Sequence, residues 1–273
     1  MKRSPVQLKK ALDQLYSEYD FEGRIKHDPI EFPKSFKHAR DIEAAGFIAS
    51  CFAYGRVELF KPVISSILSL MGCSPYRFLL SFERRRDAKL FSGIKYRFNT
   101  ESDITGLIAA LSKTYLKYGS LESLFKKYFS PDDLNVSRGL EGMTGELIKR
   151  SRAASSPGFL QFFPLPSKGS ACKRMNLFLR WMVRDRDIDF GIWKGIPKNR
   201  LIIPLDTHIA RISRCIGLTK RGAADWKTAV EITSELKKFD PEDPLKYDFS
   251  LCHQGISRVC EKSNCINCQL FIS

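Results

Sequence analysis

Three groups of residues in this chain have types and spacings that could do chemistry, and the first surrounds Lys173. The polar residues Lys173, Asn176, Arg180 and Arg184 recur three or four positions apart in an otherwise apolar stretch, which predicts one polar stripe along a helix. Such a stripe points into solvent or into a groove. The positive end of the helix dipole disfavours the ammonium form of Lys173, and a neutral amine can attack as a nucleophile. The alternative is a solvated basic face on a core helix.

The second group is the segment Pro204–Ile209, which contains Asp206 and His208. A carboxylate directly before a helix is a good N-cap, and a histidine one position inside the helix is often structural. Either side chain could instead take part in catalysis. The local sequence leaves both alternatives open.

The third group is the tail, where Cys252, Cys260, Cys265 and Cys268 fall within 17 residues and His253 adjoins the first of them. Clustered cysteines in a cytosolic chain favour a metal site over disulfides. Three thiolates with Cys252 or His253 would complete a four-ligand set for zinc or a vestigial iron–sulfur site. The remaining cysteines lack such spacing and are interpreted as buried small hydrophobes: Cys51, Cys73, Cys172 and Cys215.

The composition narrows the class of partner. The chain has 273 residues, 43% of them hydrophobic, and a formal net charge of +15, which indicates a polyanion such as nucleic acid or else serves solubility alone. The apolar run at residues 63–70 is too short to span a membrane, and the first residues lack the apolar stretch of a signal peptide. We therefore expect a cytoplasmic, ordered protein that needs no membrane.

The elements that must position these residues are helices. Apolar residues recur with helical spacing through most of the chain, and no strand-period alternation of any length occurs, so we expect an all-α fold. Capping signals place N-caps at Asp41, Asp206, Asp225 and Asp243, and a capping box at Thr100 with Asp103. The expected helices begin near Asp41, Pro62, Thr100, Ser120, Gly145, Lys173, Thr207, Asp225 and Leu245.

Two segments resemble motifs of helix-hairpin-helix DNA glycosylases. Residues 203–212 (IPLDTHIARI) are similar at nearly every position to an element of the form V-D-T-H-I-x-R-I, with Asp206 at its aspartate. Residues 169–174 (GSACKR) are similar to the end of the hairpin L-P-G-x-G-x-K-x-A, keeping one glycine and placing Lys173 at its lysine. The interval of 33 positions between Lys173 and Asp206 is similar to that of the archaeal 8-oxoguanine glycosylase branch.

The resemblance extends over residues 40–268. Residues 41–70 are similar to the first core helix pair of the superfamily, with 53–56 where other members place intercalating polar residues. The cysteine tail is similar to the iron–sulfur tail of endonuclease III, with different spacing and without the last cysteine. Residues 169–183 and 240–251 also resemble an uncharacterised bacterial family related to these enzymes.

The resemblance implies a monomeric DNA repair enzyme with two helical lobes: residues 1–40 with 205–273, and residues 41–204, which carry the degenerate hairpin. A damaged base in double-stranded DNA, such as 8-oxoguanine, would be flipped into the cleft between the lobes. Lys173 would attack C1′ and form a Schiff base with AP lyase activity, while Asp206 stabilises positive charge on the sugar. No cofactor would be required.

The resemblance also implies further contacts. The DNA backbone would be held by Lys168, Gly169, Arg174, Arg180, Arg211 and Arg214, and the base pocket would include Trp193, His208 and Tyr54. For Trp193, packing in the core is the alternative to stacking on the base. The chain could instead be a non-catalytic DNA- or RNA-binding module on a glycosylase scaffold, or a metal-dependent regulator that senses through its cysteine tail.

Overall fold

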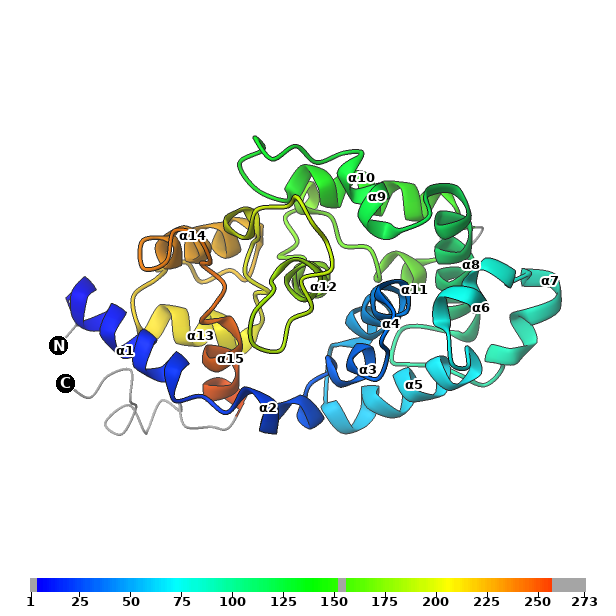
Figure 1. The fold of residues 1–273 in the computed structure, drawn as a ribbon, viewed down its shortest axis with the longest axis horizontal. Coiled ribbons are helices and arrows are strands. Elements are labelled where there is room, and N and C mark those ends of the chain that lie inside the picture. The colour runs from blue at the N-terminus through cyan, green and yellow to red at the C-terminus, as the bar shows by residue number, and fades with distance from the viewer. Residues whose placement is uncertain (1–3, 152–155, 257–273) are drawn as a thin grey trace.

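The protein is mostly helical. The computed structural model describes residues 4–151 and 156–256, and within these ranges the chain forms helices and no strand (Figure 1). Two isolated antiparallel bridges, Tyr96–Asn99 and Ser170–Asp225, are the exceptions among the described residues. The prediction of an all-α fold is confirmed.

The helices follow one another with short connections. The α-helices are α1 (Pro5–Ser17), α2 (Phe21–Arg24), α3 (Glu31–Lys34), α4 (Ala39–Phe52), α5 (Val57–Leu70), α6 (Pro75–Ser81), α7 (Arg84–Asp87), α8 (Glu101–Tyr118), α9 (Leu121–Lys126), α10 (Ser137–Lys149), α11 (Pro157–Leu160), α12 (Lys173–Val183), α13 (Thr207–Cys215), α14 (Trp226–Lys237) and α15 (Asp248–Ile256). Four 3₁₀ helices join them: η1 (Ile25–His27), η2 (Ala88–Phe91), η3 (Pro166–Lys168) and η4 (Lys198–Arg200).

Several helix starts follow the capping rules. The Thr100 hydroxyl accepts from the Asp103 N–H and the Asp103 carboxylate accepts from the Thr100 N–H, which forms the predicted capping box of α8. The side chains of Ser120, Asp206 and Asp225 cap α9, α13 and α14. Each of these caps satisfies N–H groups that have no partner inside the helix.

Two predicted caps are wrong because tertiary partners compete for the carboxylates. Asp41 lies inside α4, whose N-cap is His38, and accepts from the Ser74 hydroxyl and the Tyr76 N–H at the start of α6. Asp243 pairs with a buried arginine, and α15 begins later than predicted, at Asp248. The helix predicted near Gly145 is longer and begins at Ser137.

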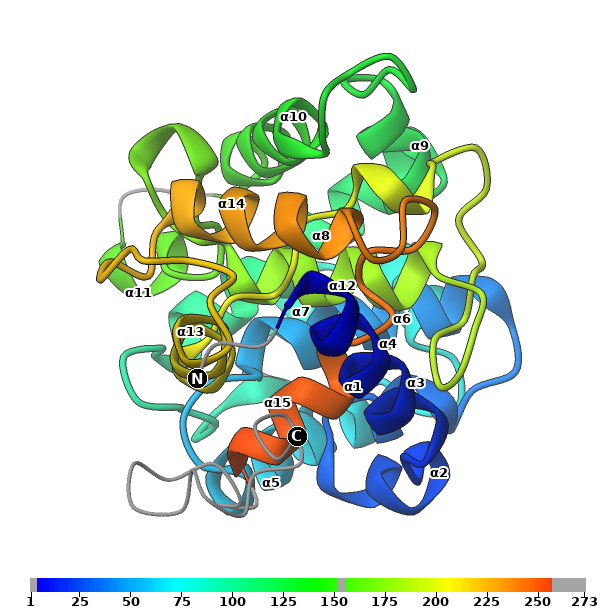
Figure 2. The same cartoon turned by 90° about the vertical axis from the view of Figure 1, so that its left-hand side faces the viewer.

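α12 lies near the middle of the molecule. In Figure 1, α1 and α13–α15 lie to its left and α4–α8 to its right, and Figure 2 brings the first group to the front. The ring of Phe178 in α12 meets Phe47 of α4 edge-on, with centroids 5.1 Å apart. Gly46 allows this close approach, since a Cβ there would lie 3.1 Å from Met182. α4 and α12 thus form a packed centre of the fold, and Lys173 is the first residue of α12.

The N-terminal segment packs against α15 and the residues before it. Tyr16 and Tyr247 meet edge-on, and Phe21 stacks on Phe249 with centroids 5.7 Å apart. The Tyr247 hydroxyl donates to Asp13 at 2.6 Å. Residues more than 200 positions apart in the sequence therefore close one end of the molecule.

The cysteines outside the tail differ in exposure. Cys51 and Cys172 are buried, as predicted, whereas Cys73 is exposed and Cys215 is partly exposed, so that the prediction for Cys73 is wrong. In the described ranges, no individual helix has the length and apolar character to cross a membrane; α5 and α6 satisfy these criteria together, across a bend of 61°.

Candidate active site

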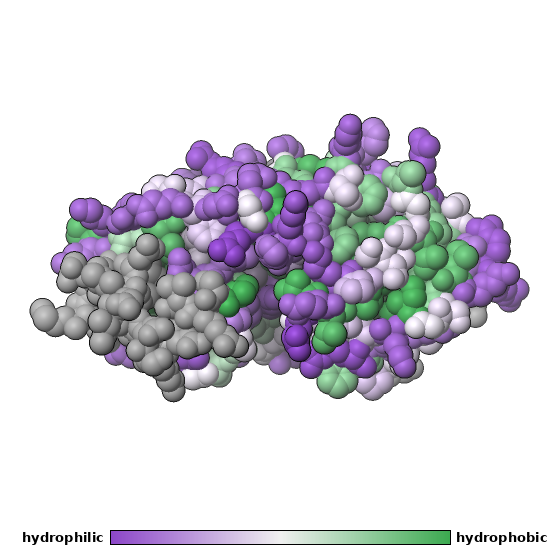
Figure 3. Space-filling model, turned by 90° about the horizontal axis from the view of Figure 1, so that it is seen from below, coloured by the Kyte–Doolittle hydropathy of each residue, from purple (hydrophilic) through white to green (hydrophobic). Residues whose placement is uncertain are grey.

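A large pocket opens beside the N-terminal end of α12. Its volume is about 1050 Å³, and the surface seen from below is hollowed near its middle (Figure 3). Its walls come from segments that are far apart in sequence, so the fold brings them together. They are residues 27–29, 53–58, 204–208 and 248–249, with Phe60, Lys173, Leu177, Arg180, Arg211, Ala224, Cys252, His253, Gly255 and Ile256.

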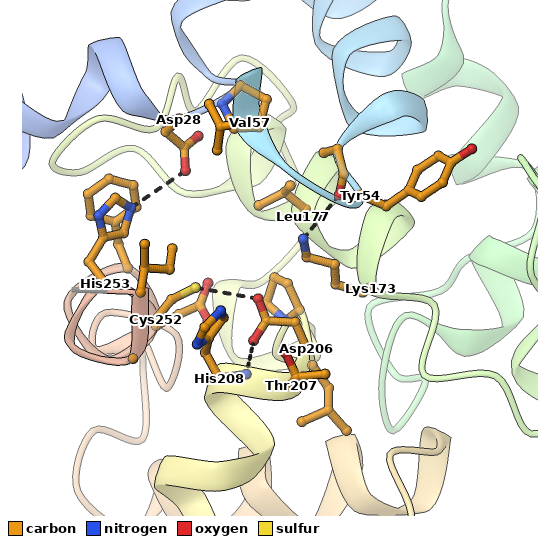
Figure 4. Close-up of a pocket in the computed structure, with 18 of the residues that line it drawn as sticks. Asp28, Tyr54, Val57, Lys173, Leu177, Asp206, Thr207, His208, Cys252 and His253 are labelled. Atoms are coloured by element: carbon orange, nitrogen blue, oxygen red, sulfur yellow. Dashed lines mark hydrogen bonds and ion pairs between the residues drawn. The ribbon is translucent and has the colours of Figure 1, made fainter. Parts of the chain in front are cut away.

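Lys173 is the first residue of α12, and its amine points into the pocket (Figure 4). Cys172 precedes it in the left-handed conformation with φ 50° and provides no side-chain cap. The Nζ atom donates to the main-chain oxygen of Ala53 at 3.1 Å, just past the C-terminal end of α4. The amine is half-buried at the pocket wall, where a ligand can reach it.

Asp206 lines the same pocket and performs two tasks. Its Oδ1 accepts from the N–H groups of His208 and Ile209, both at 2.9 Å, and so caps α13. Its Oδ2 accepts from the Cys252 thiol at 3.5 Å (Figure 4). The structure thus brings the side chains of Lys173 and Asp206 to one cavity, although 33 positions separate them.

The crossing of α13 and α15 forms one wall of the pocket. A Cβ on Gly255 would lie 2.6 Å from the Cβ of His208, so this position leaves no room for a side chain. Arg211 donates to the Gly255 carbonyl at 3.1 Å, at the end of α15. His208 and Arg211 line the pocket, with Arg211 also holding α15 in place.

The polar stripe of α12 does not face solvent, which corrects the prediction for its later members. Asn176, Arg180 and Arg184 are at most 2% exposed. Arg180 pairs with Asp248 at 2.5 Å and with Asp189 at 3.3 Å. Burial alone would lower the pKa of Arg180, but Asp189 and Asp248 raise it above its usual value. Arg180 borders the pocket as a buried member of an ion network and is not placed to contact a DNA backbone.

Arg184 extends the same network. It bonds to Asp243 through Nε at 2.9 Å, to Asp187 through Nη2 at 3.0 Å, and to Asp189 through Nη1. Desolvation opposes its charge, yet the carboxylates raise the pKa of Arg184 above its usual value. A charge buried in this way is stable only while its partners remain.

Arg174 also differs from the prediction of a DNA contact. Its two terminal nitrogens donate to the main-chain oxygens of Cys51 and Gln161, and its guanidinium lies 4.9 Å from the ring centroid of Tyr54. Burial lowers the pKa of Arg174. The residue fastens α12 to the end of α4, and it does not line the pocket.

The structure separates the two aromatic residues predicted for the base pocket. Trp193 is 2% exposed and donates to the buried Glu43 carboxylate at 2.7 Å, away from the pocket, so its role is packing. Tyr54 lines the pocket rim, but its ring points away from Lys173 (Figure 4) and its hydroxyl donates to Asn99 at 2.7 Å. Stacking of a base on Trp193 is not compatible with this arrangement, whereas Tyr54, at the pocket rim, stays a predicted residue of the base pocket.

The turn before α12 packs against the start of α14. Gly169 is left-handed with φ 78°, its N–H donates to Pro166, and its carbonyl accepts from the Trp226 N–H at 3.1 Å. The Cys172 N–H donates to the Ser170 hydroxyl at 3.2 Å. The N–H groups of Gly169, a predicted contact of the DNA backbone, and of Cys172 are therefore used within the protein. Lys168 and Arg214 are exposed and lie outside the pocket lining.

The predicted metal ligands fall mostly outside the described residues. Cys260, Cys265 and Cys268 belong to that part of the chain, and Cys252 contacts Asp206. Among residues 4–151 and 156–256, no group of three or more His, Cys, Asp or Glu side chains is arranged to hold a metal ion. His253 is buried, with its Nε2 3.8 Å from Asp28 and its ring 4.3 Å from that of Phe249.

Sequence reasoning missed two carboxylates of the pocket. Asp28 faces His253, and Asp248 pairs with Arg180. Burial raises the pKa of Asp248 to about 6, while Arg180 acts in the opposite direction. An acidic residue within the apolar run Tyr247–Leu251 was the available signal, since a buried charge requires a partner.

No curated protein and no solved structure matches the chain significantly. A family model matches residues 28–257, a range that contains every pocket-lining residue except His27. That family is described as "Protein of unknown function (DUF2400)", and the chain belongs to it.

Proposed function

We propose that this protein is a DNA glycosylase with AP lyase activity that removes a damaged base, with an oxidised purine such as 8-oxoguanine as its substrate. One observation carries the proposal: Lys173 and Asp206, the two residues at the lysine and aspartate positions of the glycosylase motifs, line the same pocket of about 1050 Å³. An amine and a carboxylate beside a cavity of this size suit a flipped nucleotide. The net charge of +15 favours a polyanionic substrate.

The chemistry starts at Lys173. Its neutral amine forms a bond to C1′ of the sugar, while the bond from C1′ to the base breaks and the base leaves with the electron pair and takes up a proton. Loss of a proton from nitrogen and opening of the sugar ring give a Schiff base, and β-elimination then breaks the strand. Before it attacks, the amine must release the carbonyl of Ala53, to which it donates in the free protein.

Asp206 supports this reaction by its charge. As the base leaves, positive charge develops on the sugar, and a fixed carboxylate stabilises that charge without having to reorganise. Two main-chain N–H groups hold Oδ1, which leaves Oδ2 on the pocket side with the Cys252 thiol. Capping α13 and stabilising the transition state are therefore compatible tasks for the one side chain.

The lobes expected from the resemblance are part of the proposal. The pocket lining includes residues 27–29 and residues from 205–256, which belong to one expected lobe, and also residues 53–60, 173–180 and Pro204, which belong to the other. This division agrees with a lobe of residues 1–40 and 205–273 facing a lobe of residues 41–204. Exposed Lys168 and Arg214 remain candidates for backbone contacts in cytoplasmic DNA repair.

A second candidate, a non-catalytic nucleic-acid-binding module, is favoured by one observation. The Lys173 amine is already engaged as a donor to Ala53, and two N–H groups of the preceding turn are bonded within the protein. In such a module the pocket would hold an unpaired base without breaking any bond. The two functions differ in whether a covalent intermediate forms.

Borohydride trapping tests this difference. Duplexes that carry 8-oxoguanine, other lesions or an abasic site are incubated with the protein and reduced, and we expect a covalent adduct with the wild-type chain. Lys173→Arg keeps the charge but cannot form the Schiff base, so we expect it to bind DNA without trapping. Lys10→Ala, at an exposed position of α1 outside the pocket lining, is the matched control and should trap normally. No adduct on any substrate, or an adduct that persists in Lys173→Arg, would contradict the proposal.

A further inference from the structure

Cys252 makes an unusual contact for a residue in a candidate active site. Its Sγ lies 3.5 Å from Oδ2 of Asp206, and the side chain points from α15 towards the start of α13 (Figure 4). Cap bonds from His208 and Ile209 hold the other oxygen, Oδ1. Among the described residues, the Cys252 thiol thus donates to Oδ2, the Asp206 oxygen that takes no part in the helix cap.

The backbone fixes this contact. Gly255 allows α15 to approach His208 closely, and Arg211 bonds to the Gly255 carbonyl at 3.1 Å. These contacts lie one turn beyond Cys252 on the same helix, so they set the position of its Sγ relative to α13. The contact is therefore a consequence of how the two helices cross.

The surroundings keep Cys252 protonated. Burial first, and then the carboxylates of Asp206, Asp248 and Asp28, raise the pKa of the thiol well above its usual value, while Lys173 acts in the opposite direction. A protonated thiol donates a hydrogen bond and is a poor nucleophile. Because a thiol is a weak donor, it can orient the carboxylate while leaving most of the charge on the oxygen.

We propose that Cys252 is a positioning residue, whose thiol holds the Oδ2 atom of Asp206 in the orientation that serves the reaction at Lys173. It acts through Asp206 and does not touch the substrate. This inference rests on the glycosylase function proposed above. It also assigns a task to a cysteine that the sequence placed in a metal cluster.

Kinetics provide the first test. Single-turnover base release is measured with enzyme in excess over a lesion duplex, for the wild-type chain, Cys252→Ala and Cys252→Ser. We expect Cys252→Ala to lower the rate about tenfold, since it removes a hydrogen bond to a charged group, with DNA affinity unchanged. The acidic limb of its rate–pH profile should move to higher pH. Cys252→Ser, which retains a donor, should recover both the rate and the profile.

The outcomes separate the two proposals. A wild-type chain that neither releases a base nor traps would remove the glycosylase function. A wild-type chain that is active and a Cys252→Ala variant with the same rate and pH profile would instead remove the positioning role alone. Circular dichroism of each variant is the control that tests whether it is folded.

Alkylation tests the contact without DNA or activity. Iodoacetamide labelling is followed by peptide mass spectrometry, with the exposed Cys73 as the internal reference. Asp206→Asn removes the neighbouring negative charge, so we expect labelling of Cys252 relative to Cys73 to accelerate several-fold. Asp225→Asn is the matched control, because Asp225 caps α14 in the same way at another site. Equal labelling in the wild-type chain and Asp206→Asn, or equal acceleration in Asp225→Asn, would overturn the inference.

Discussion

The first turn of α12 carries a cation, and so do its last turn and its C-cap Arg184, but the surroundings of these cations differ. Lys173 in the first turn reaches a pocket and donates to the carbonyl of Ala53. Arg180 and Arg184 are at most 2% exposed and bind a cluster of carboxylates. Helical spacing shows that residues share a face, and the tertiary structure decides whether that face is open or covered.

This difference predicts separate consequences for stability and for chemistry. Where the stripe is buried, a substitution should destabilise the fold, because it leaves carboxylates without their partner. Where the stripe reaches the pocket, a substitution should remove activity and spare the fold. Three measurements of the free energy of unfolding test this distinction.

The largest effect is expected at Arg184. Arg184→Ala leaves Asp187, Asp189 and Asp243 with a missing cation and should lower the free energy of unfolding by about 3 to 5 kcal/mol. Urea denaturation followed by circular dichroism measures the loss. The exposed Arg186→Ala is the matched control and should change little. Equal stability of the two variants would show that the network does not hold the fold.

The next effect is a pH dependence at Asp248. Its pKa is about 6 in the folded chain against an ordinary value of 3.8, so the folded state binds more protons between these values. The stabilising contribution of this group is therefore complete below about pH 4 and is lost as the pH rises through 6.

The amide of Asp248→Asn cannot titrate, which isolates this contribution. The stability of the wild-type chain relative to the variant should fall by about 3 kcal/mol between pH 4 and pH 7, measured by urea denaturation at each pH. A difference that stays constant over this range would contradict the raised pKa of Asp248.

The smallest effect on stability is expected at Lys173. Lys173→Ala removes one hydrogen bond at a pocket wall and should lower the free energy of unfolding by about 1 kcal/mol or less. The same variant should lose borohydride trapping completely. A loss of stability as large as that of Arg184→Ala would make Lys173 a structural residue and remove the distinction between the two parts of the stripe.

Much of the fold could be predicted because local chemistry decides it. The capping box of Thr100 and Asp103 and the cap of Asp206 involve groups within three residues, so the sequence contains all the partners. Asp41 and Asp243 failed as predicted caps because their partners, Ser74 and Arg184, lie at least 33 positions away. Local sequence rules show that a carboxylate can cap a helix, but they do not show which group it binds in the folded protein.

The site was less predictable for the same reason. Lys173 and Asp206 were selected by resemblance to a family, and spacing alone could not place them at one cavity. The position of Trp193 was predicted wrongly because the local sequence does not distinguish an exposed indole from a buried one. The buried Glu43 that accepts its hydrogen bond lies 150 positions away. The pocket residues Asp28 and Asp248 were missed because neither belongs to a recognisable sequence motif.

The glycine in the last turn of α15 has a consequence for variation of the sequence. Because a Cβ at Gly255 would lie 2.6 Å from that of His208, even the smallest side chain would act as a spacer between α13 and α15. The spacing of α13 and α15 at this wall of the cavity therefore depends on the absence of a side chain at Gly255, which lines the pocket but carries no reactive group. In a library with every amino acid at each position, we expect fewer folded variants at Gly255 than at Lys173 or Asp206. Any side chain at Gly255 would push α15 away from α13 and so disrupt the pocket wall that these two helices form.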